Sequence, residues 1–242
     1  MPQRSLNGDQ FPHVPERISG LVELAENLWW SWHPQARMLF KMLDRQIWKD
    51  SHHNPDQMLR SVSPEALQEA TRDANYLRHY DLVMSQFEKC IFKLSTPVHI
   101  DPCDQSIKPI AYFSAEYGLH HSLPFYAGGL GFLAGDHLKE CSDMGVPLVA
   151  VGFMYPSGYL HQQIGDDGWQ QDFTQEFDRD STAVNRVLDS TGEQLVINIP
   201  CILYPSIHIA IWKVSVGRIS LYLMDPDIEH NEPWIRQISD RL

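Results

Sequence analysis

Hydrophobic residues in the first third of the chain recur every three or four positions, as they do on one face of a helix. Between residues 15 and 50 this face comprises Ile18, Leu21, Leu24, Ala25, Leu28, Trp29 and Trp32. Pro34 interrupts the pattern, which then resumes. A further helix is predicted to begin at Ser63, as N-cap, with Pro64 in its first position, and to continue to Phe87. The first 93 or so residues are therefore predicted to be helical.

The pattern changes after residues 95–109, where prolines and turn-forming residues predict a boundary. Residues 110–113 form a short apolar run typical of a buried strand, and 146–155 form a nearly continuous one, as in parallel strands buried on both faces. Between them a helix is predicted to begin in a glycine-rich stretch and to end at Gly145, a left-handed position. Strand, helix and strand in this order predict a βαβ unit.

Beyond residue 193 the pattern is typical of strands, including two apolar runs joined at Gly217 and Arg218 in a hairpin-like turn. The final stretch, "EPWIRQISDRL", has the pattern of the first turns of a helix. The predicted class is α/β, with a helical domain over 1–95 and an α/β region over 96–242.

Composition and charge narrow the range of possible functions. The chain has 242 residues, 43% of them hydrophobic, and a formal net charge of −12, so as a whole it repels nucleic acid and anionic membranes. Four cysteines at wide spacing indicate neither a zinc knuckle nor a disulfide framework. The N-terminal stretch lacks the apolar core of a signal peptide, and no apolar run approaches the roughly 18 residues of a membrane span. A cytosolic protein with reduced thiols is expected.

The stretch 126–140, "YAGGLGFLAGDHLKE", places glycines at a predicted helix start. Free N–H groups there, with Gly128, Gly129 and Gly131 removing steric hindrance, would form a phosphate site. Two alternatives remain: a tight turn or close helix–strand packing, and a dinucleotide fingerprint over 129–134. The fingerprint is disfavoured because the preceding strand ends well before the glycines and the next strand has no acidic residue at its end.

The stretch from "AYFSAEYGLHHSLPFYAGGLGFLAGDHLKE" through "DGWQ" resembles the N-terminal domain of alpha-glucan phosphorylases. The opening helices, through "LAENLWWSWHPQARMLF" and "SHHNPDQML", resemble the extra helical domain of the bacterial and archaeal branch of that family. The resemblance covers residues 15–242. It implies part of the first Rossmann-like domain of a B-type glycosyltransferase fold, and phosphorolysis of terminal α-1,4-linked glucose to glucose 1-phosphate.

The resemblance also implies site residues. Gly128, Gly129, Leu130 and Gly131 match a loop that donates backbone N–H groups to the phosphates of substrate and of pyridoxal 5′-phosphate, which a lysine of a second domain carries. Glu116 matches an acidic residue near the catalytic cleft, and the resemblance implies a catalytic role for it; a surface or loop-bracing carboxylate is the alternative. Trp169 matches a position beside the cleft, where it would stack on sugar, and a buried structural tryptophan is the alternative.

No metal site is predicted, because His120, His121, His137 and His161 lack partners at metal-ligand spacing.

The family resemblance extends only to its N-terminal part, and no lysine here has the context of the cofactor site. We therefore expect the isolated chain neither to bind pyridoxal phosphate covalently nor to phosphorolyse glucan. Two alternatives are a non-catalytic glucan-binding or interaction module, which self-associates or pairs with a complementary domain, and a starch-synthase-like nucleotide-sugar transferase. The transferase ranks below phosphorylase, because Tyr126 and Ala127 stand where those enzymes have a lysine.

Overall fold

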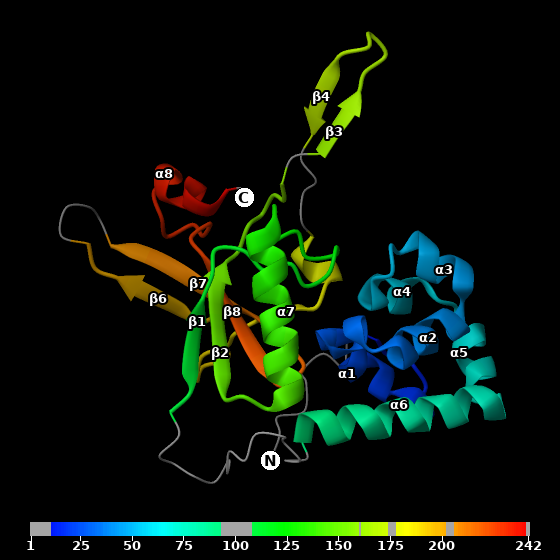
Figure 1. Ribbon diagram of the computed structural model, residues 1–242. Coiled ribbons are helices and arrows are strands. Elements are labelled where there is room, and N and C mark those ends of the chain that lie inside the picture. Colours follow the sequence, from blue (N-terminus) through cyan, green and yellow to red (C-terminus); the bar gives the residue numbers. More distant parts are fainter. Residues whose placement is uncertain (1–10, 93–107, 160, 174–177, 202–205, 241–242) are drawn as a thin grey trace.

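The computed structural model describes residues 11–92, 108–159, 161–173, 178–201 and 206–240. A helical region comes first and is followed by a twisted sheet with one long helix across it (Figure 1). The helical region contains η2 (Glu16–Ile18), α1 (Gly20–Glu26), η3 (Leu28–Trp32), α2 (Pro34–Leu43), α3 (Arg45–Asp50), α4 (Pro55–Ser61), α5 (Pro64–Ala70) and α6 (Ala74–Phe92). The prediction of a helical first third is confirmed for the described residues.

Local sequence explains where these helices begin and where the predicted helix is interrupted. Ser63 caps α5, because its hydroxyl accepts a hydrogen bond from the Ala66 N–H at 3.1 Å. The predicted continuous helix from Ser63 to Phe87 is wrong, since α5 and α6 are separate. The Asp73 carboxylate accepts a hydrogen bond from the Asn75 N–H at 2.8 Å, as a cap does at a new helix start.

The main sheet has the strand order β1-β2-β8-β7-β5. β6 also pairs with β7, at residues 207–210, whereas β5 pairs with residues 212–214. β1 (Ile110–Phe113), β2 (Leu148–Phe153) and β8 (Ile219–Asp225) are parallel. β7 (Ile207–Val216) runs antiparallel to β8, β5 (Val184–Arg186) and β6 (Val196–Ile199). The helix α7 (Gly129–Met144) connects β1 to β2, which confirms the predicted βαβ unit.

The remaining elements lie outside the main sheet. β3 (His161–Ile164) and β4 (Gln170–Phe173) form a separate hairpin that projects from the rest of the chain (Figure 1). A short 3-10 turn, η4 (Arg179–Ser181), precedes β5. The predicted terminal helix is present as α8 (Pro233–Arg236) and η5 (Gln237–Ser239).

One strand is less buried than its sequence predicts. The apolar run of β1 indicates a buried strand, but Ile110 is 53% exposed and Phe113 is 70% exposed. The reason is position: β1 is the last strand at its side of the described sheet and has only β2 as a neighbour. An apolar run does not distinguish a central strand from an edge strand.

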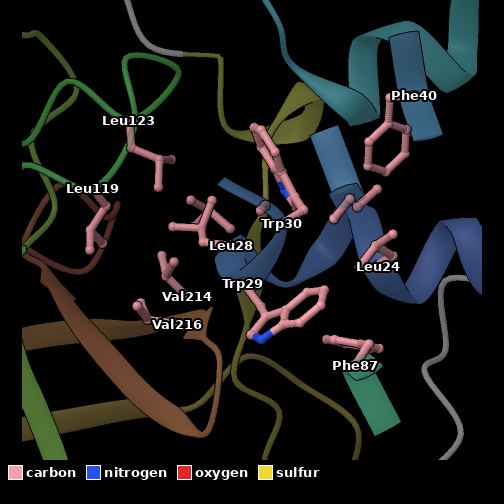
Figure 2. Packing of buried hydrophobic residues seen from close by; sticks show 14 of the residues in the cluster. Leu24, Leu28, Trp29, Trp30, Phe40, Phe87, Leu119, Leu123, Val214 and Val216 are labelled. Atoms are coloured by element: carbon pink, nitrogen blue, oxygen red, sulfur yellow. The ribbon is translucent and has the colours of Figure 1, made fainter. Parts of the chain in front are cut away.

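Aromatic side chains of η3 join the helical region to the sheet. Figure 2 shows Leu28, Trp29 and Trp30 between Phe40 and Phe87 on one side and Val214 and Val216 of β7 on the other. The Trp29 and Phe87 rings are 5.3 Å apart. A single hydrophobic cluster includes residues of both parts of the chain, so the two share a core. Residues 93–107, which contain most of the predicted boundary, lie outside the described residues, and the division at residue 95 stays a prediction.

A buried asparagine reinforces this junction. The Asn27 side-chain amide donates to the Gly217 carbonyl at 3.0 Å, and its oxygen accepts from the Gly217 N–H at 2.8 Å and the Trp29 N–H at 3.0 Å. Gly217, in the predicted two-residue hairpin turn, has a φ of 59°. A Cβ there would lie 2.0 Å from the Ser142 hydroxyl of α7. Asn27 thus connects the first helices to the turn between β7 and β8.

We predict that Asn27→Ala lowers the free energy of unfolding by about 2–4 kcal/mol, because it leaves buried N–H and carbonyl groups of Gly217 unpaired. Denaturant unfolding monitored by tryptophan fluorescence measures the change. Asn75→Ala, at an exposed position of α6, is the matched control and should shift stability by less than about 0.5 kcal/mol. Equal stability of Asn27→Ala and the native chain would contradict the proposed anchor.

Candidate functional site

The parallel strands place their carboxyl ends at one edge of the sheet, where ligands bind in open α/β folds. The chain leaves β1 at this edge and reaches α7 through residues 114–128, which we call the β1–α7 loop. This loop contains Glu116 and leads directly into the glycines at the start of α7. The predicted phosphate-binding residues therefore lie at the carboxyl edge of the sheet.

Tyr117 fixes the β1–α7 loop to the sheet. Its hydroxyl contacts the Tyr112 carbonyl at 3.1 Å and the Val151 carbonyl at 3.0 Å, and its backbone N–H donates to the Phe125 carbonyl at 2.7 Å. Burial raises the pKa of Tyr117, so its hydroxyl keeps its proton and remains a donor. Phe125 and Leu123 are buried below the loop. The loop is consequently held from both of its ends.

Two glycines of α7 are required by close packing. A Cβ at Gly135 would lie 2.2 Å from the Gly118 carbonyl oxygen, and one at Gly131 would lie 2.4 Å from the Tyr126 Cβ. The Gly118 N–H also donates to the Gly131 carbonyl at 2.7 Å. The packing alternative considered for the glycine stretch thus holds for Gly131 and Gly135. Their spacing of four residues, on one face of a helix, is the sequence signal for this contact.

Close packing does not require glycine at the other two positions, Gly128 and Gly129. A Cβ at Gly128 or Gly129 would meet nothing within 4 Å. Gly128 has an extended backbone, with φ −147° and ψ −154°, that any residue adopts. Glycine also costs about 1 kcal/mol relative to alanine in a helix. Packing and local conformation therefore do not explain these two glycines, whereas a ligand that approaches the backbone would.

The four predicted phosphate-binding N–H groups are not equivalent. The Gly128 N–H donates to Glu116, and the Gly131 N–H donates to the Gly128 carbonyl at 3.1 Å. Within the described part of the chain, the N–H groups of Gly129 and Leu130 have no acceptor, as is usual in the first turn of a helix. These two exposed positions are the available anion donors.

Glu116 lies directly beside these donors. Its Oε2 accepts hydrogen bonds from the Ala127 N–H at 3.0 Å and the Gly128 N–H at 3.2 Å. The Ser114 hydroxyl contacts the Glu116 backbone and fixes the turn on the other side. The structure therefore places Glu116 next to the glycines. Its contacts there match the loop-bracing alternative, and a catalytic role stays a prediction.

Trp169 is placed elsewhere. It follows the turn of the β3–β4 hairpin, where Gly168 has a φ of 79° and the Gly165 N–H donates to the Trp169 carbonyl at 2.8 Å. Its side chain is 74% exposed, so the alternative of a buried structural tryptophan is wrong for the described chain. The hairpin projects away from the sheet (Figure 1), and the structure does not bring Trp169 together with Glu116 and the glycines.

Two of the histidines considered as metal ligands, His120 and His137, contact aromatic rings. His120 packs edge-on against Trp30 with ring centroids 4.8 Å apart, and its Nδ1 contacts the Ser122 hydroxyl at 2.9 Å. Burial, followed by neighbouring positive charges, lowers the pKa of His120 to about 3. The ring of His137 lies 4.9 Å from that of Tyr112, and His161 is in β3. Among the described residues, no group of three or more His, Cys, Asp and Glu is arranged to hold a metal ion.

Comparison with known proteins shows which proteins this chain resembles. Residues 14–123 match a family described as "Protein of unknown function (DUF3417)". The chain is 44% identical over 226 residues to a glycogen phosphorylase of Aquifex aeolicus. It is 37% identical over 229 residues to a maltodextrin phosphorylase of Thermococcus litoralis, and 37% identical over 237 residues to a glycogen phosphorylase of Mycobacterium tuberculosis.

These matches cover 92–95% of the chain and 27–31% of the relatives. The chain matches the N-terminal part of a glucan phosphorylase. The resemblance predicted from the β1–α7 loop and the opening helices is thereby confirmed. Because the chain spans less than a third of these relatives' length, the phosphorylase activity of the whole proteins is not transferred to it by similarity alone.

None of the helices in the described part of the chain is long and apolar enough to cross a membrane.

The glycines provide a test by matched substitution. Gly135→Ala should lower the free energy of unfolding by about 2 kcal/mol or more, because its methyl group would overlap the Gly118 carbonyl. Gly128→Ala, with open space around its Cβ, should be neutral within about 1 kcal/mol. Denaturant unfolding of both variants measures the difference. Similar losses for both would show that packing explains the whole glycine stretch.

The neutral state of His120 predicts acid sensitivity. A histidine whose pKa is lowered in the folded chain stabilises the fold fully above its unfolded pKa of about 6.5 and loses this contribution as pH falls toward about 3. Unfolding midpoints between pH 7 and 4 should therefore decrease more steeply for the native chain than for His120→Asn. His230→Asn, at an exposed position, is the control and should retain the native slope. Identical slopes for the native chain and His120→Asn would contradict a histidine that stays neutral in the folded chain.

Proposed function

We propose that this chain supplies the phosphate-binding half of an alpha-glucan phosphorylase active site. The observation that carries the proposal is the contrast among the glycines. Gly131 and Gly135 fill tight contacts, whereas Gly128 and Gly129 leave open space beside two N–H groups without acceptors. Those N–H groups, of Gly129 and Leu130, lie at the positive end of the α7 dipole.

The site chemistry suits phosphorolysis. In that reaction the α-1,4 bond to the terminal glucose breaks and a phosphate oxygen bonds to C1 of that glucose, which retains its configuration. The 4-hydroxyl of the shortened glucan leaves with a proton supplied by the phosphate, so negative charge redistributes among phosphate oxygens in the transition state. Backbone donors that are already fixed stabilise such charge without reorganisation. Tyr117 and Glu116 keep the β1–α7 loop in place, so the two donors are pre-oriented. We assign the α/β part, by the same proposal, to the first Rossmann-like domain of a B-type glycosyltransferase fold.

The glycines at the start of α7 also fit the cofactor of the family. Pyridoxal 5′-phosphate, when bound, supplies a phosphate that exchanges protons with the substrate phosphate. In this chain the open space at Gly128 and Gly129 leaves room for a phosphoryl group, and the donors of Gly129 and Leu130 would face it. We expect the lysine that carries the cofactor to lie in a second domain, outside residues 1–242.

We assign Glu116 a positioning role in this site. Its carboxylate occupies the N–H groups of Ala127 and Gly128, which leaves the next two N–H groups for phosphate. Glu116→Gln retains an oxygen acceptor for both bonds, whereas Glu116→Ala removes it. A positioning role therefore requires that phosphate binding survive the first substitution and weaken in the second. Equal loss in both would favour a role for the charge itself.

A glucan-binding module is the second candidate, and one observation favours it. Trp169, Ile164 and Phe173 on the β3–β4 hairpin are 74%, 80% and 45% exposed. Aromatic faces exposed in this way stack on sugar rings or contact a partner protein. Fluorescence titration of the chain with maltoheptaose measures the first possibility, and Trp169→Ala is the variant that should abolish the response.

We predict that Gly129→Asp reduces the affinity for inorganic phosphate and glucose 1-phosphate at least tenfold, because it places a negative charge in the open space beside the donors. Isothermal titration calorimetry at constant ionic strength measures this affinity. Gly129→Asn is the matched control for size, and it should retain more affinity than Gly129→Asp. Unchanged affinity in Gly129→Asp would exclude the start of α7 as the phosphate site.

A further inference from the structure

The middle of the β1–α7 loop, residues 119–123, contacts the helical region. Leu119 and Leu123 are 4% and 0% exposed, and they belong to the hydrophobic cluster that also contains Leu28 and Trp30 of η3 (Figure 2). The loop that leads to the candidate site is therefore part of the core that the helices share with the sheet.

Two adjacent histidines of the loop make direct contacts with the helices. The His120 ring packs edge-on against the Trp30 ring, with centroids 4.8 Å apart. Trp30 is itself packed within the helical region, where its ring centroid lies 5.9 Å from that of Trp48. His121 Nε2 forms a short hydrogen-bond contact with the carbonyl of His52, in the turn between α3 and α4. Two separate parts of the helical region thus contact consecutive residues of the loop.

Local hydrogen bonds orient His120 toward its partner. The Ser122 N–H donates to His120 Nδ1 at 3.2 Å, so Nδ1 is the ring nitrogen that carries no proton. The Ser122 hydroxyl contacts the same nitrogen at 2.9 Å, and the Leu123 N–H donates to the His120 carbonyl at 2.9 Å. The turn therefore presents a neutral imidazole to Trp30, which agrees with the lowered pKa of this histidine.

The turn that contacts His121 has an unfavourable backbone conformation. His52 and His53 have φ values of 50° and 59°, in the left-handed region that residues with a Cβ disfavour. The His53 ring lies 5.2 Å from the Trp48 ring and 6.1 Å from the His121 ring. Such a conformation persists only where surrounding contacts hold it. Contacts with the loop are among those that surround this turn.

The family match includes both sides of this contact. It covers residues 14–123 and so ends inside the β1–α7 loop, at the buried Leu123. The matched unit therefore contains the helical region, β1 and the loop segment that contacts the helices. Helices and loop segment belong to one unit of sequence, although the sheet continues well beyond it.

We propose that the helical region holds the β1–α7 loop in position for phosphate binding, with His120 and His121 as the positioning residues. This role rests on the proposed function, because the groups that are positioned are the donors at the start of α7. The loop has three supports. Tyr117 bonds to the sheet, Gly118 bonds to α7, and the two histidines contact the helices.

The third support matters because of where it acts. Glu116 and the two N–H groups that it accepts, of Ala127 and Gly128, lie on opposite sides of the segment that the helices hold. If residues 119–123 move, the two ends of the loop no longer have a fixed separation. Donors that are not fixed must reorganise when an anion arrives, which weakens binding.

Amide hydrogen exchange followed by NMR tests this support without requiring phosphate to bind. His121→Ala removes a contact with the helices, so the Ala127 and Gly128 amides should exchange at least tenfold faster. His121→Gln keeps an N–H donor near the place of Nε2 and should retain most of the native protection. His79→Ala is the matched control, because His79 Nε2 makes the same kind of contact, with the Gln35 carbonyl at 2.9 Å, inside the helical region. It should leave both loop amides unchanged.

Phosphate affinity tests the positioning role itself. Calorimetric titration with inorganic phosphate is performed at constant ionic strength and at a temperature where every variant is folded. His121→Ala should bind at least threefold more weakly than the native chain, and His121→Gln should bind with nearly native affinity. His120→Ala is a second, independent variant with the same expected loss, and the exposed His121 keeps the test valid if His120→Ala misfolds. A purely structural role would lower stability but leave the affinity of the folded chain unchanged.

The outcomes separate this inference from the proposed function. Equal exchange of the loop amides in His121→Ala and His79→Ala would overturn the support by the helices. Native phosphate affinity in both His121→Ala and His120→Ala would overturn the positioning role. A native chain that binds no phosphate would contradict the proposed function instead, and the exchange rates would still decide whether the helices hold the loop.

Discussion

The close approach of the Gly118 backbone to the first turns of α7 is the constraint on which the candidate site depends. The Gly118 carbonyl lies where a side chain at position 135 would be, and its N–H is bonded to the Gly131 carbonyl. Only helix positions without a side chain allow this contact. The contact fixes where α7 begins relative to β1. The positions of Glu116 and of the free N–H groups of Gly129 and Leu130 follow from it.

The sheet is built to keep this approach in place. Gly152 of β2 faces Tyr117, whose ring would lie 2.7 Å from a Cβ at that position, so the β1–α7 loop rests directly on the strand. At the other end of α7, the Ser142 hydroxyl accepts a hydrogen bond from the Arg218 N–H at 3.0 Å and contacts the hairpin turn that Asn27 holds. The helix is therefore fixed at both ends by polar contacts, one of which extends to the helical region. Pre-orientation of a helix mouth is what an anion site needs, because fixed dipoles need no reorganisation when charge arrives.

Several features could be predicted from the sequence because they depend on local physics. The helical first third, the Ser63 cap, the left-handed Gly145 and the β7–β8 turn at Gly217 follow from periodicity and from single-residue conformational preferences. The glycine stretch at the start of α7 pointed to close backbone approach; the packing explanation applies to Gly131 and Gly135, and the phosphate explanation stays a prediction for Gly128 and Gly129. Only the packing around each position distinguishes Gly131 from Gly129, and packing is set by residues distant in sequence.

Other features needed the three-dimensional structure. The exposure of Phe113 depends on which strands flank β1, and the exposure of Trp169 depends on a hairpin that leaves the sheet. Spacing could not show that Glu116 bonds to Ala127 and Gly128, eleven and twelve residues later, or that His53 and His121 meet across 68 positions. Such contacts join segments that are separate in the chain and carry no periodic signal.

The most direct test of the account follows backbone amide signals of the 242-residue chain by NMR during titration with inorganic phosphate at constant ionic strength. The account predicts saturable downfield shifts of the Gly129 and Leu130 amides, which gain an acceptor, and smaller changes at Ala127 and Gly128, which remain bonded to Glu116. If the Gly129 and Leu130 amides stay unshifted at saturating phosphate, the open glycines are not an anion site, and the central claim is contradicted.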